Sequence, residues 1–161
     1  MTGTTPTTFE PEAPLSRAML ATILWRMEGE PALFYRPIFD DVVSGRWYSE
    51  AVLWAYEEGV VLGTGPGIFQ PEIDITREQF ATMLYRYAQV AGHDVGVPSD
   101  FGLDWFGDSY DISDWAEEAM YWAVYNGLIT GSTGGVLAPQ AAASRAEAAT
   151  ILARFMERFD G

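Results

Sequence analysis

The sequence predicts an all-α fold built from tandem helix–loop–helix repeats, and three observations support this prediction. One segment occurs three times without a gap, beginning at Gly3, Gly63 and Gly131. Each copy places apolar residues at helical spacing behind a Ser or Thr, which are residue types that favour a helix N-cap. A loop rich in small residues, Gly and Pro precedes each predicted helix. We expect helices from different copies to share one central helical core, because one helix pair cannot bury its apolar faces alone.

The segment that occurs three times, named the B segment, predicts one helix per copy. Its predicted N-caps are Ser16, Thr76 and Ser144. Apolar residues follow at the spacing of one helix face. In the three copies they are Leu20, Ile23, Leu24 and Met27, then Phe80, Met83, Leu84 and Tyr87, then Ala148, Ile151, Leu152 and Phe155.

A different segment, named the A segment, precedes the second and third B segments and also predicts a helix. Trp54 and Trp122 hold equivalent places on its apolar face, so we expect both in the core. Gly59 and Gly127 stand where a glycine ends a helix.

The order of segments along the chain is B, A–B, A–B, which predicts two complete modules and a half. Residues 1–31 are expected to form the second half of a first module, 32–91 a second module and 92–161 a third. The chain is therefore expected to start inside a module, and the N-terminus shows no signal peptide. His93 falls in the Gly- and Pro-containing linker before the last A segment, where we expect a solvated side chain.

The charge of the chain excludes several partners. Its formal net charge is -14, and all nine of its basic residues are Arg. Such a surface repels nucleic acid phosphates and anionic lipid headgroups, so neither nucleic acid binding nor membrane insertion is expected. The chain has no Cys and one His, so no metal site and no cofactor are predicted.

The two segments together resemble the repeat of the S-layer homology family, which has the form F-x-D-V, W-Y, A-V-x-W-A, G-(I/V)-(V/I)-x-G, F-x-P and (I/L)-(T/S)-R-A-E. The likeness covers nearly the whole chain. In the second copy the matching residues include Phe39, Asp41, Val42, Trp47, Tyr48, Ala51, Trp54, Gly59, Gly63, Phe69, Pro71, Thr76 and Arg77. In the third copy they include Phe106, Asp108, Trp115, Ala119, Trp122, Gly127, Gly131, Pro139, Ser144, Arg145, Ala146 and Glu147.

The last motif of the repeat departs from the family form in two of the three copies. The third copy keeps the acidic residue, as Glu147. The second copy has Gln79 at that place and the first has Met19. The acidic position is therefore lost twice.

The resemblance implies a pseudo-threefold array of three modules, with grooves between neighbours. Family members of this kind work outside the cell, on the cell wall or S-layer. The implied function is the non-covalent anchoring of a secreted bacterial protein. The grooves would bind secondary cell-wall polysaccharide, carrying a pyruvate ketal or another anionic sugar, and no enzyme activity is expected.

Three Arg are the leading candidates for ligand contact. Arg17, Arg77 and Arg145 each occupy the first position of a predicted helix, where free N–H groups and the helix dipole attract anions. The planar guanidinium also matches a carboxylate. Further candidates are Trp47 and Trp115 for stacking on sugar, Asp41 and Asp108 for sugar hydroxyls, and the loop residues Gly63, Thr64, Gly131 and Ser132 for backbone N–H contacts.

Several alternatives stay open. Each of the three Arg can instead pair with an acidic residue of a neighbouring helix, and the recurring Arg26, Arg86 and Arg154 favour structural ion pairs. Trp47 and Trp115 can equally belong to the core. The acidic run from Asp100 to Asp114 lacks the spacing of a calcium loop, and no pair among the 23 acidic residues is marked as a glycosidase centre.

The alternative function is a structural or self-assembly module that mediates protein contacts without binding sugar. An incomplete first module would expose apolar helix faces, and two chains would then pair to cover them. A homodimer formed through the incomplete first module is therefore a further expected partner.

Overall fold

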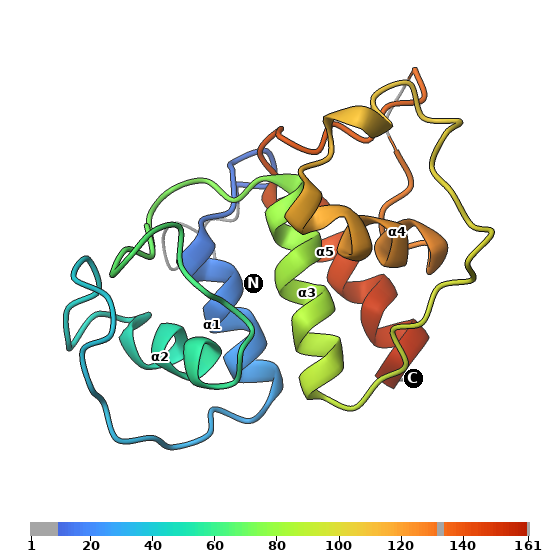
Figure 1. Ribbon diagram of the computed structural model, residues 1–161. Helices are drawn as coiled ribbons and strands as arrows, with labels where there is room; N and C mark the ends of the chain where they lie inside the picture. Colours follow the sequence, from blue (N-terminus) through green and yellow to red (C-terminus); the bar gives the residue numbers. More distant parts are fainter. Residues whose placement is uncertain (1–9, 132–133, 161) are drawn as a thin grey trace.

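The computed structural model describes residues 10–131 and 134–160 (Figure 1). These residues contain short helices, isolated β-bridges and no strand, so the all-α prediction is confirmed. The α-helices are α1 (Arg17–Met27), α2 (Ser49–Glu57), α3 (Arg77–Val90), α4 (Glu117–Tyr125) and α5 (Arg145–Phe155). Shorter helical turns are η1 (Ser109–Asp111), η2 (Asp114–Ala116) and the π-helical η3 (Met156–Asp160).

The three B helices, α1, α3 and α5, begin where the sequence predicts. Ser16, Thr76 and Ser144 are their N-caps, and each side chain accepts a hydrogen bond from the backbone N–H three residues on. In α1 and α3 the side chain of the residue at that third position accepts a hydrogen bond from the backbone N–H of the N-cap, which completes a capping box. In α5 no such return bond is formed by Glu147.

Each A helix packs against the B helix that comes before it in the chain. Figure 1 shows α2 beside α1 and α4 beside α3, and both pairs are in close contact. The predicted core residues of α3 and α5 are all buried, and so are Trp54 and Trp122. In α1, Leu20 and Leu24 are buried as predicted, whereas Ile23 and Met27 are only partly buried at the edge of the core.

Backbone hydrogen bonds join the three copies in a closed ring just before their helices. The N–H of Leu15 donates to the carbonyl of Ala143 at 2.9 Å, and the N–H of Ala143 donates to Ile75 at 2.9 Å. The N–H of Ile75 returns to the carbonyl of Leu15 at 2.7 Å. These three residues hold equivalent places in the repeat and are almost completely buried. The N-terminal ends of α1, α3 and α5 are therefore held together directly.

The prediction that His93 is a solvated loop residue is wrong. Its side chain is only 20% exposed and lies 3.2 Å from a carboxylate oxygen of Asp160. Its ring also packs against Phe155 and Phe159, at centroid distances of 5.8 and 5.2 Å. The linker folds back on the end of α5, a tertiary contact that the local composition of the linker does not encode.

Candidate functional site

The glycine loop between α2 and α3 adopts its conformation without strain only with glycine at position 63. Gly63 has φ +89°, and a Cβ there would lie 2.7 Å from the carbonyl oxygen of Ile68 and 2.8 Å from the ring of Phe39. The loop is closed by a hydrogen bond from the N–H of Thr64 to that same carbonyl, at 2.9 Å. Gly131 repeats this arrangement in the next copy, against the ring of Phe106 at 2.6 Å.

An aspartate from the start of each A segment fixes the loop that follows. The Asp41 carboxylate accepts hydrogen bonds from the N–H groups of Phe69 at 2.9 Å and Gln70 at 2.7 Å. Asp108 accepts in the same way from Leu137 and Ala138, both at 2.8 Å. Because charged acceptors make the stronger hydrogen bonds, these carboxylates hold the two loops in place.

A backbone carbonyl of the fixed loop accepts a hydrogen bond from the first residue of the preceding B helix. Arg17 donates from Nε to the carbonyl of Phe69 at 2.9 Å, and its guanidinium lies 4.6 Å from the centroid of the Phe69 ring. Arg77 donates from Nε to the carbonyl of Leu137 at 2.7 Å. In both copies the bond uses Nε, so the two terminal nitrogens of the fork point elsewhere.

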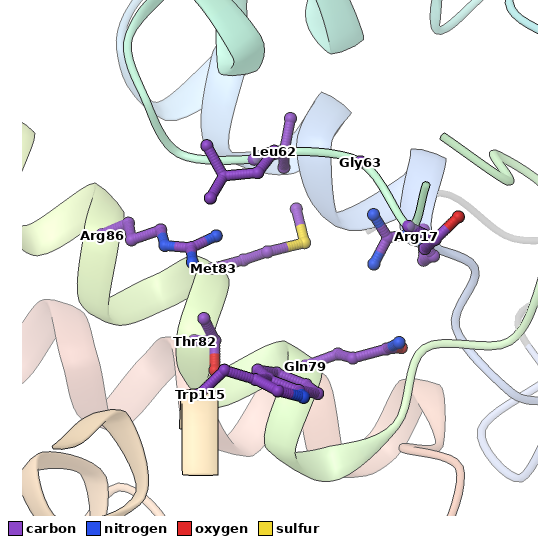
Figure 2. Close-up of a pocket in the computed structure, with 10 residues that line it drawn as sticks. Arg17, Leu62, Gly63, Gln79, Thr82, Met83, Arg86 and Trp115 are labelled. Atoms are coloured by element: carbon purple, nitrogen blue, oxygen red, sulfur yellow. The ribbon is translucent and has the colours of Figure 1, made fainter. Parts of the chain in front are cut away.

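The first of two matched pockets, named the Arg17 groove, has a volume of about 360 Å³. Figure 2 shows its labelled residues, with the guanidinium groups of Arg17 and Arg86 on opposite sides of the hollow and pointing toward one another. The lining comes from α1, from the glycine loop, from α3 and from the turn before α4. Its residues are Arg17, Val61, Leu62, Gly63, Thr64, Gln79, Thr82, Met83, Arg86 and Trp115.

The Arg17 groove holds positive charge that no carboxylate neutralises directly. Burial lowers the pKa of Arg17 to about 10; the charge of Asp41 raises it and that of Arg86 lowers it further. Burial also lowers the pKa of Arg86. Both guanidinium groups remain charged at neutral pH, and within the described residues neither forms an ion pair. A cation that is partly removed from water without a counter-ion is unfavourable, so this groove suits an anion.

The second pocket, named the Arg77 groove, has the same volume of about 360 Å³ but a different charge pattern. It is lined by the equivalent residues of the next copies, among them Arg77, Ile129, Gly131, Glu147, Thr150 and Arg154. Nη1 of Arg77 forms an ion pair with Glu147 of α5. Arg154 donates to the carbonyl of Leu128 at 3.3 Å. This groove therefore contains its own anion.

The structure brings together some of the predicted site residues. Arg17, Gly63, Thr64 and Trp115 line the Arg17 groove, and Trp115 is 55% exposed, so it is not a core residue. Arg77 and Gly131 line the Arg77 groove.

Other predicted site residues lie outside these grooves. Trp47 lines a separate hollow, although it is also exposed. Asp41 and Asp108 line neither groove and serve the loops instead. Arg145 is 4% exposed and also lines neither, and Ser132 falls outside the described residues. Contact of all these residues with sugar stays a prediction.

The expected free N–H groups at the helix N-termini are not there. The N–H of Arg17 donates to Ile73 and that of Ala18 to Pro71, while the third N–H goes to the N-cap. The same bonds occur at α3 and α5, with carbonyls of the neighbouring copy as acceptors. The prediction was wrong because tertiary backbone bonds between copies take the donors. The first N–H groups of α1, α3 and α5 are therefore not available to an anion.

Sequence reasoning missed three polar residues of the Arg17 groove. Gln79, Thr82 and Arg86 share one face of α3 and line the pocket. Arg86 was expected to form a structural ion pair, as Arg26 does with Glu30 at 3.8 Å, but it forms none among the described residues. Gln79, Thr82 and Arg86 follow one another at steps of three and four residues, and this helical spacing was the signal that could have found them.

Comparison with known proteins decides the family. The sequence profile of the S-layer homology domain matches residues 38–81 and 106–149, which together are more than half of the chain. The chain belongs to the S-layer homology domain family. Family membership and the surface-layer relatives indicate an extracellular, cell-wall-associated location.

Similar proteins include enzymes and surface proteins. The chain is 32% identical to an exoglucanase, XynX, of Acetivibrio thermocellus, over 97% of this chain and 14% of the relative. It is 32% identical to a cellulosome-anchoring protein of the same organism, over 93% of this chain and 34% of the relative. It is 29% identical to the S-layer protein sap of Bacillus anthracis, over 94% of this chain and 18% of the relative.

The S-layer homology chain thus spans about a third or less of the relatives it matches. The relatives named as enzymes match it only over a small part of their length, so their activities do not transfer to it. Within residues 10–131 and 134–160, no group of His, Asp and Glu is arranged to hold a metal ion. No helix in that part of the chain is long and apolar enough to cross a membrane.

Proposed function

We propose that this chain is a non-catalytic module that anchors a secreted bacterial protein by binding secondary cell-wall polysaccharide. The observation that carries this proposal is the Arg17 groove. In a chain with a formal net charge of -14, this groove presents Arg17 and Arg86 without a carboxylate partner among the described residues. A sugar that carries a carboxylate, such as a pyruvate ketal, supplies the missing anion.

The other groove residues suit a carbohydrate. Trp115 is half-exposed and offers an aromatic surface to the apolar face of a sugar ring. Thr64, Thr82 and Gln79 add hydroxyl and amide groups that exchange hydrogen bonds with sugar hydroxyls. A cavity of about 360 Å³ falls within the range of small-molecule sites.

We also propose the family's pseudo-threefold arrangement for the B helices, within a first half-module and two full modules. The supporting observation is that equivalent residues of the three copies exchange backbone hydrogen bonds in a closed ring. In this arrangement each motif Arg faces the next B helix around the ring. The Arg17 groove then lies between the first and second copies, and the Arg77 groove lies between the second and third.

The relatives support a role in attachment. A cellulosome-anchoring protein, a surface-layer protein of Lysinibacillus sphaericus and an S-layer protein of Bacillus anthracis each contain a segment similar to this chain. Relatives named as enzymes contain such a segment too. A segment shared by enzymes and surface proteins fits a common attachment function better than a common reaction.

Calorimetric titration with a pyruvylated wall disaccharide tests the proposal. We expect binding by the intact chain, and a loss of about tenfold or more in affinity for Arg86→Gln, which removes one groove cation. Arg36→Gln is the matched control, since Arg36 pairs with Glu57 on the surface and lines neither groove. No binding by the intact chain at millimolar disaccharide would refute the proposal.

Self-association is the second candidate function, and α5 provides the observation that favours it. Ala149 and Thr150 are exposed, whereas the equivalent Ala81 and Thr82 of α3 are buried. Helix α2 packs on α1 and α4 packs on α3. Helix α4 reaches α5 through the rings of Trp122 and Phe155 and leaves Ala149 and Thr150 exposed. We propose that a second copy of this chain covers this face. Sedimentation equilibrium tests this second candidate. The intact chain should form a dimer that Ala149→Glu abolishes. If the intact chain is a monomer at all concentrations, self-association through this face is refuted.

A further inference from the structure

A further hollow, named the Trp47 hollow, lies apart from the Arg17 and Arg77 grooves and shares no lining residue with either. Its volume is about 220 Å³. The lining comes from the last turns of α1, the first turn of α2 and the segment that connects these two helices. Among its residues are Trp25, Tyr35, Arg46, Trp47, Ser49 and Glu50.

The aromatic walls of the Trp47 hollow are held by hydrogen bonds to backbone carbonyls. Nε1 of Trp25 donates to the carbonyl of Pro31 at 3.2 Å. The hydroxyl of Tyr35 donates to the carbonyl of Val42 at 3.0 Å. Trp47 itself is 59% exposed, so much of its ring surface is open to a ligand. The hollow therefore offers fixed aromatic walls beside an accessible indole.

The polar groups of the hollow are arranged around a buried serine. Ser49 is 1% exposed, and its Oγ donates to the carbonyl of Val43 at 2.5 Å and accepts the N–H of Arg46 at 3.0 Å. These bonds fix the backbone that carries Arg46 at the beginning of α2. The side chains of Arg46 and Glu50 are exposed, and within the described residues neither forms an ion pair. The hollow thus holds one charged donor and one charged acceptor that are both available.

The third copy of the repeat has different groups at the same places. Asp114 stands where the second copy has Arg46. Glu118, the counterpart of Glu50, accepts a hydrogen bond from the hydroxyl of Tyr85 at 3.3 Å. An available donor and an available acceptor in the second copy therefore become two acidic residues in the third, one of them already bonded. The packing of an A helix on a B helix does not require the groups of the Trp47 hollow.

The chemistry of the hollow matches a sugar that carries no charge. Each sugar hydroxyl both donates and accepts hydrogen bonds, so one ring can use a guanidinium and a carboxylate together. The apolar face of the ring suits an aromatic side chain. One positive and one negative side chain give an ionic ligand no net attraction, in contrast to the two cations of the Arg17 groove. The volume is below that of sites for drug-sized molecules, so it suits a single ring.

We propose that the Trp47 hollow is a second carbohydrate site, which binds one uncharged sugar unit. The ring stacks on Trp47, and its hydroxyls accept from Arg46 and donate to Glu50. This site goes beyond the proposed function, because its lining and its ligand are separate from those of the Arg17 groove. Either site can therefore fail without the other.

Nuclear magnetic resonance of the indole N–H groups tests the proposal, since the chain has six Trp. The probes are methyl β-D-glucopyranoside and methyl N-acetyl-β-D-glucosaminide, a plain and an N-acetylated uncharged unit. We expect at least one of them to shift the signals of Trp25 and Trp47 saturably, with a Kd of about 1–10 mM. The tighter probe identifies the kind of unit. No saturable shift with either probe would overturn the inference.

Substitutions on the rim of the hollow sharpen the test. Trp47→Ala, Arg46→Gln and Glu50→Gln should each weaken binding by about fivefold or more. The matched controls are Trp105→Ala and Arg158→Gln, which change exposed residues outside the hollow. Tighter binding by Glu50→Gln, or equal losses in the controls, would contradict the proposed contacts.

One further variant separates this site from the proposed function. Arg86→Gln changes the Arg17 groove and should leave glycoside binding at the Trp47 hollow unchanged. If the glycosides shift the signal of Trp115 in place of those of Trp25 and Trp47, the sugar binds in the Arg17 groove and the inference is overturned. If they bind at Trp47 while the pyruvylated disaccharide does not bind at all, the inference stands and the proposed function is refuted.

Discussion

The Arg17 groove and the Arg77 groove are two versions of one design with different charges. In both grooves the motif Arg donates a hydrogen bond to a carbonyl of a loop that an aspartate fixes, and both grooves have the same volume. They differ in the residue opposite the Arg and in the presence of Trp115, which lines only the first of these two grooves. The backbone of the repeat thus sets the shape of a groove, while a few side chains decide what it can hold.

The largest expected effect concerns the shared backbone. Gly63→Ala should destabilise the chain by about 2–4 kcal/mol, because a Cβ would strain a left-handed backbone and collide with Ile68 and Phe39. Urea denaturation measures the effect. Gly59→Ala is the control, since φ is +82° there and nothing lies within 4 Å of the new Cβ. It should cost only about 1 kcal/mol. Equal losses would show that the close approach at Gly63 is unimportant.

The next largest effect on stability is expected at Asp41 and Asp108, the two aspartates that fix the loops, and it should be larger at Asp41. Asp108→Asn should cost about 1–3 kcal/mol, because an amide cannot accept both N–H bonds that the carboxylate accepts. Asp41→Asn should cost more, since the Asp41 charge also raises the pKa of Arg17 and so favours its charged form. The same urea titrations compare the two variants. A larger loss for Asp108→Asn would contradict the view that the Arg17 groove carries the less compensated charge.

Trp115 should affect binding rather than stability. Trp115→Ala is expected to weaken disaccharide binding about fivefold, which corresponds to about 1 kcal/mol for an aromatic contact. Trp105→Ala is the control, because Trp105 is similarly exposed, at 62%, but lines neither groove. Calorimetry of both variants measures the difference. Equal affinities for the two variants would remove Trp115 from the site.

The smallest effect should come from the ion pair that distinguishes the Arg77 groove. Glu147→Gln should change the free energy of unfolding by less than about 1 kcal/mol, because the Glu147 side chain is 41% exposed and such pairs contribute little. A loss of several kcal/mol in urea denaturation would contradict this expectation and would mean that Glu147 is needed for folding.

The sequence predicted the elements of this fold well because their signals are local. The N-caps at Ser16, Thr76 and Ser144 and the burial of Trp54 and Trp122 depend on spacing within one segment. The division into modules ending at residues 31 and 91 stays a prediction, and so does sugar contact by Arg145 and Trp47.

The remaining errors have tertiary causes. The helix N–H groups were expected to be free, but carbonyls from other copies accept them. Arg86 was expected in an ion pair, yet it faces Arg17 across a hollow that forms only when α1 and α3 come together. His93 was expected in solvent, yet it packs on aromatic residues far along the chain. In each case the partner lies in a segment that a reading of local pattern does not bring near.

The closed ring of Leu15, Ile75 and Ala143 has a consequence for how this protein is made. An open stack of repeats can gain or lose a unit and keep most of its contacts. A ring cannot, because removing one member leaves the other two with broken bonds. The ring also joins residues that are far apart in the sequence, so it forms only after Ala143 has left the ribosome. Contacts between such distant residues slow folding, and a nascent chain that has completed only two copies must wait for the third.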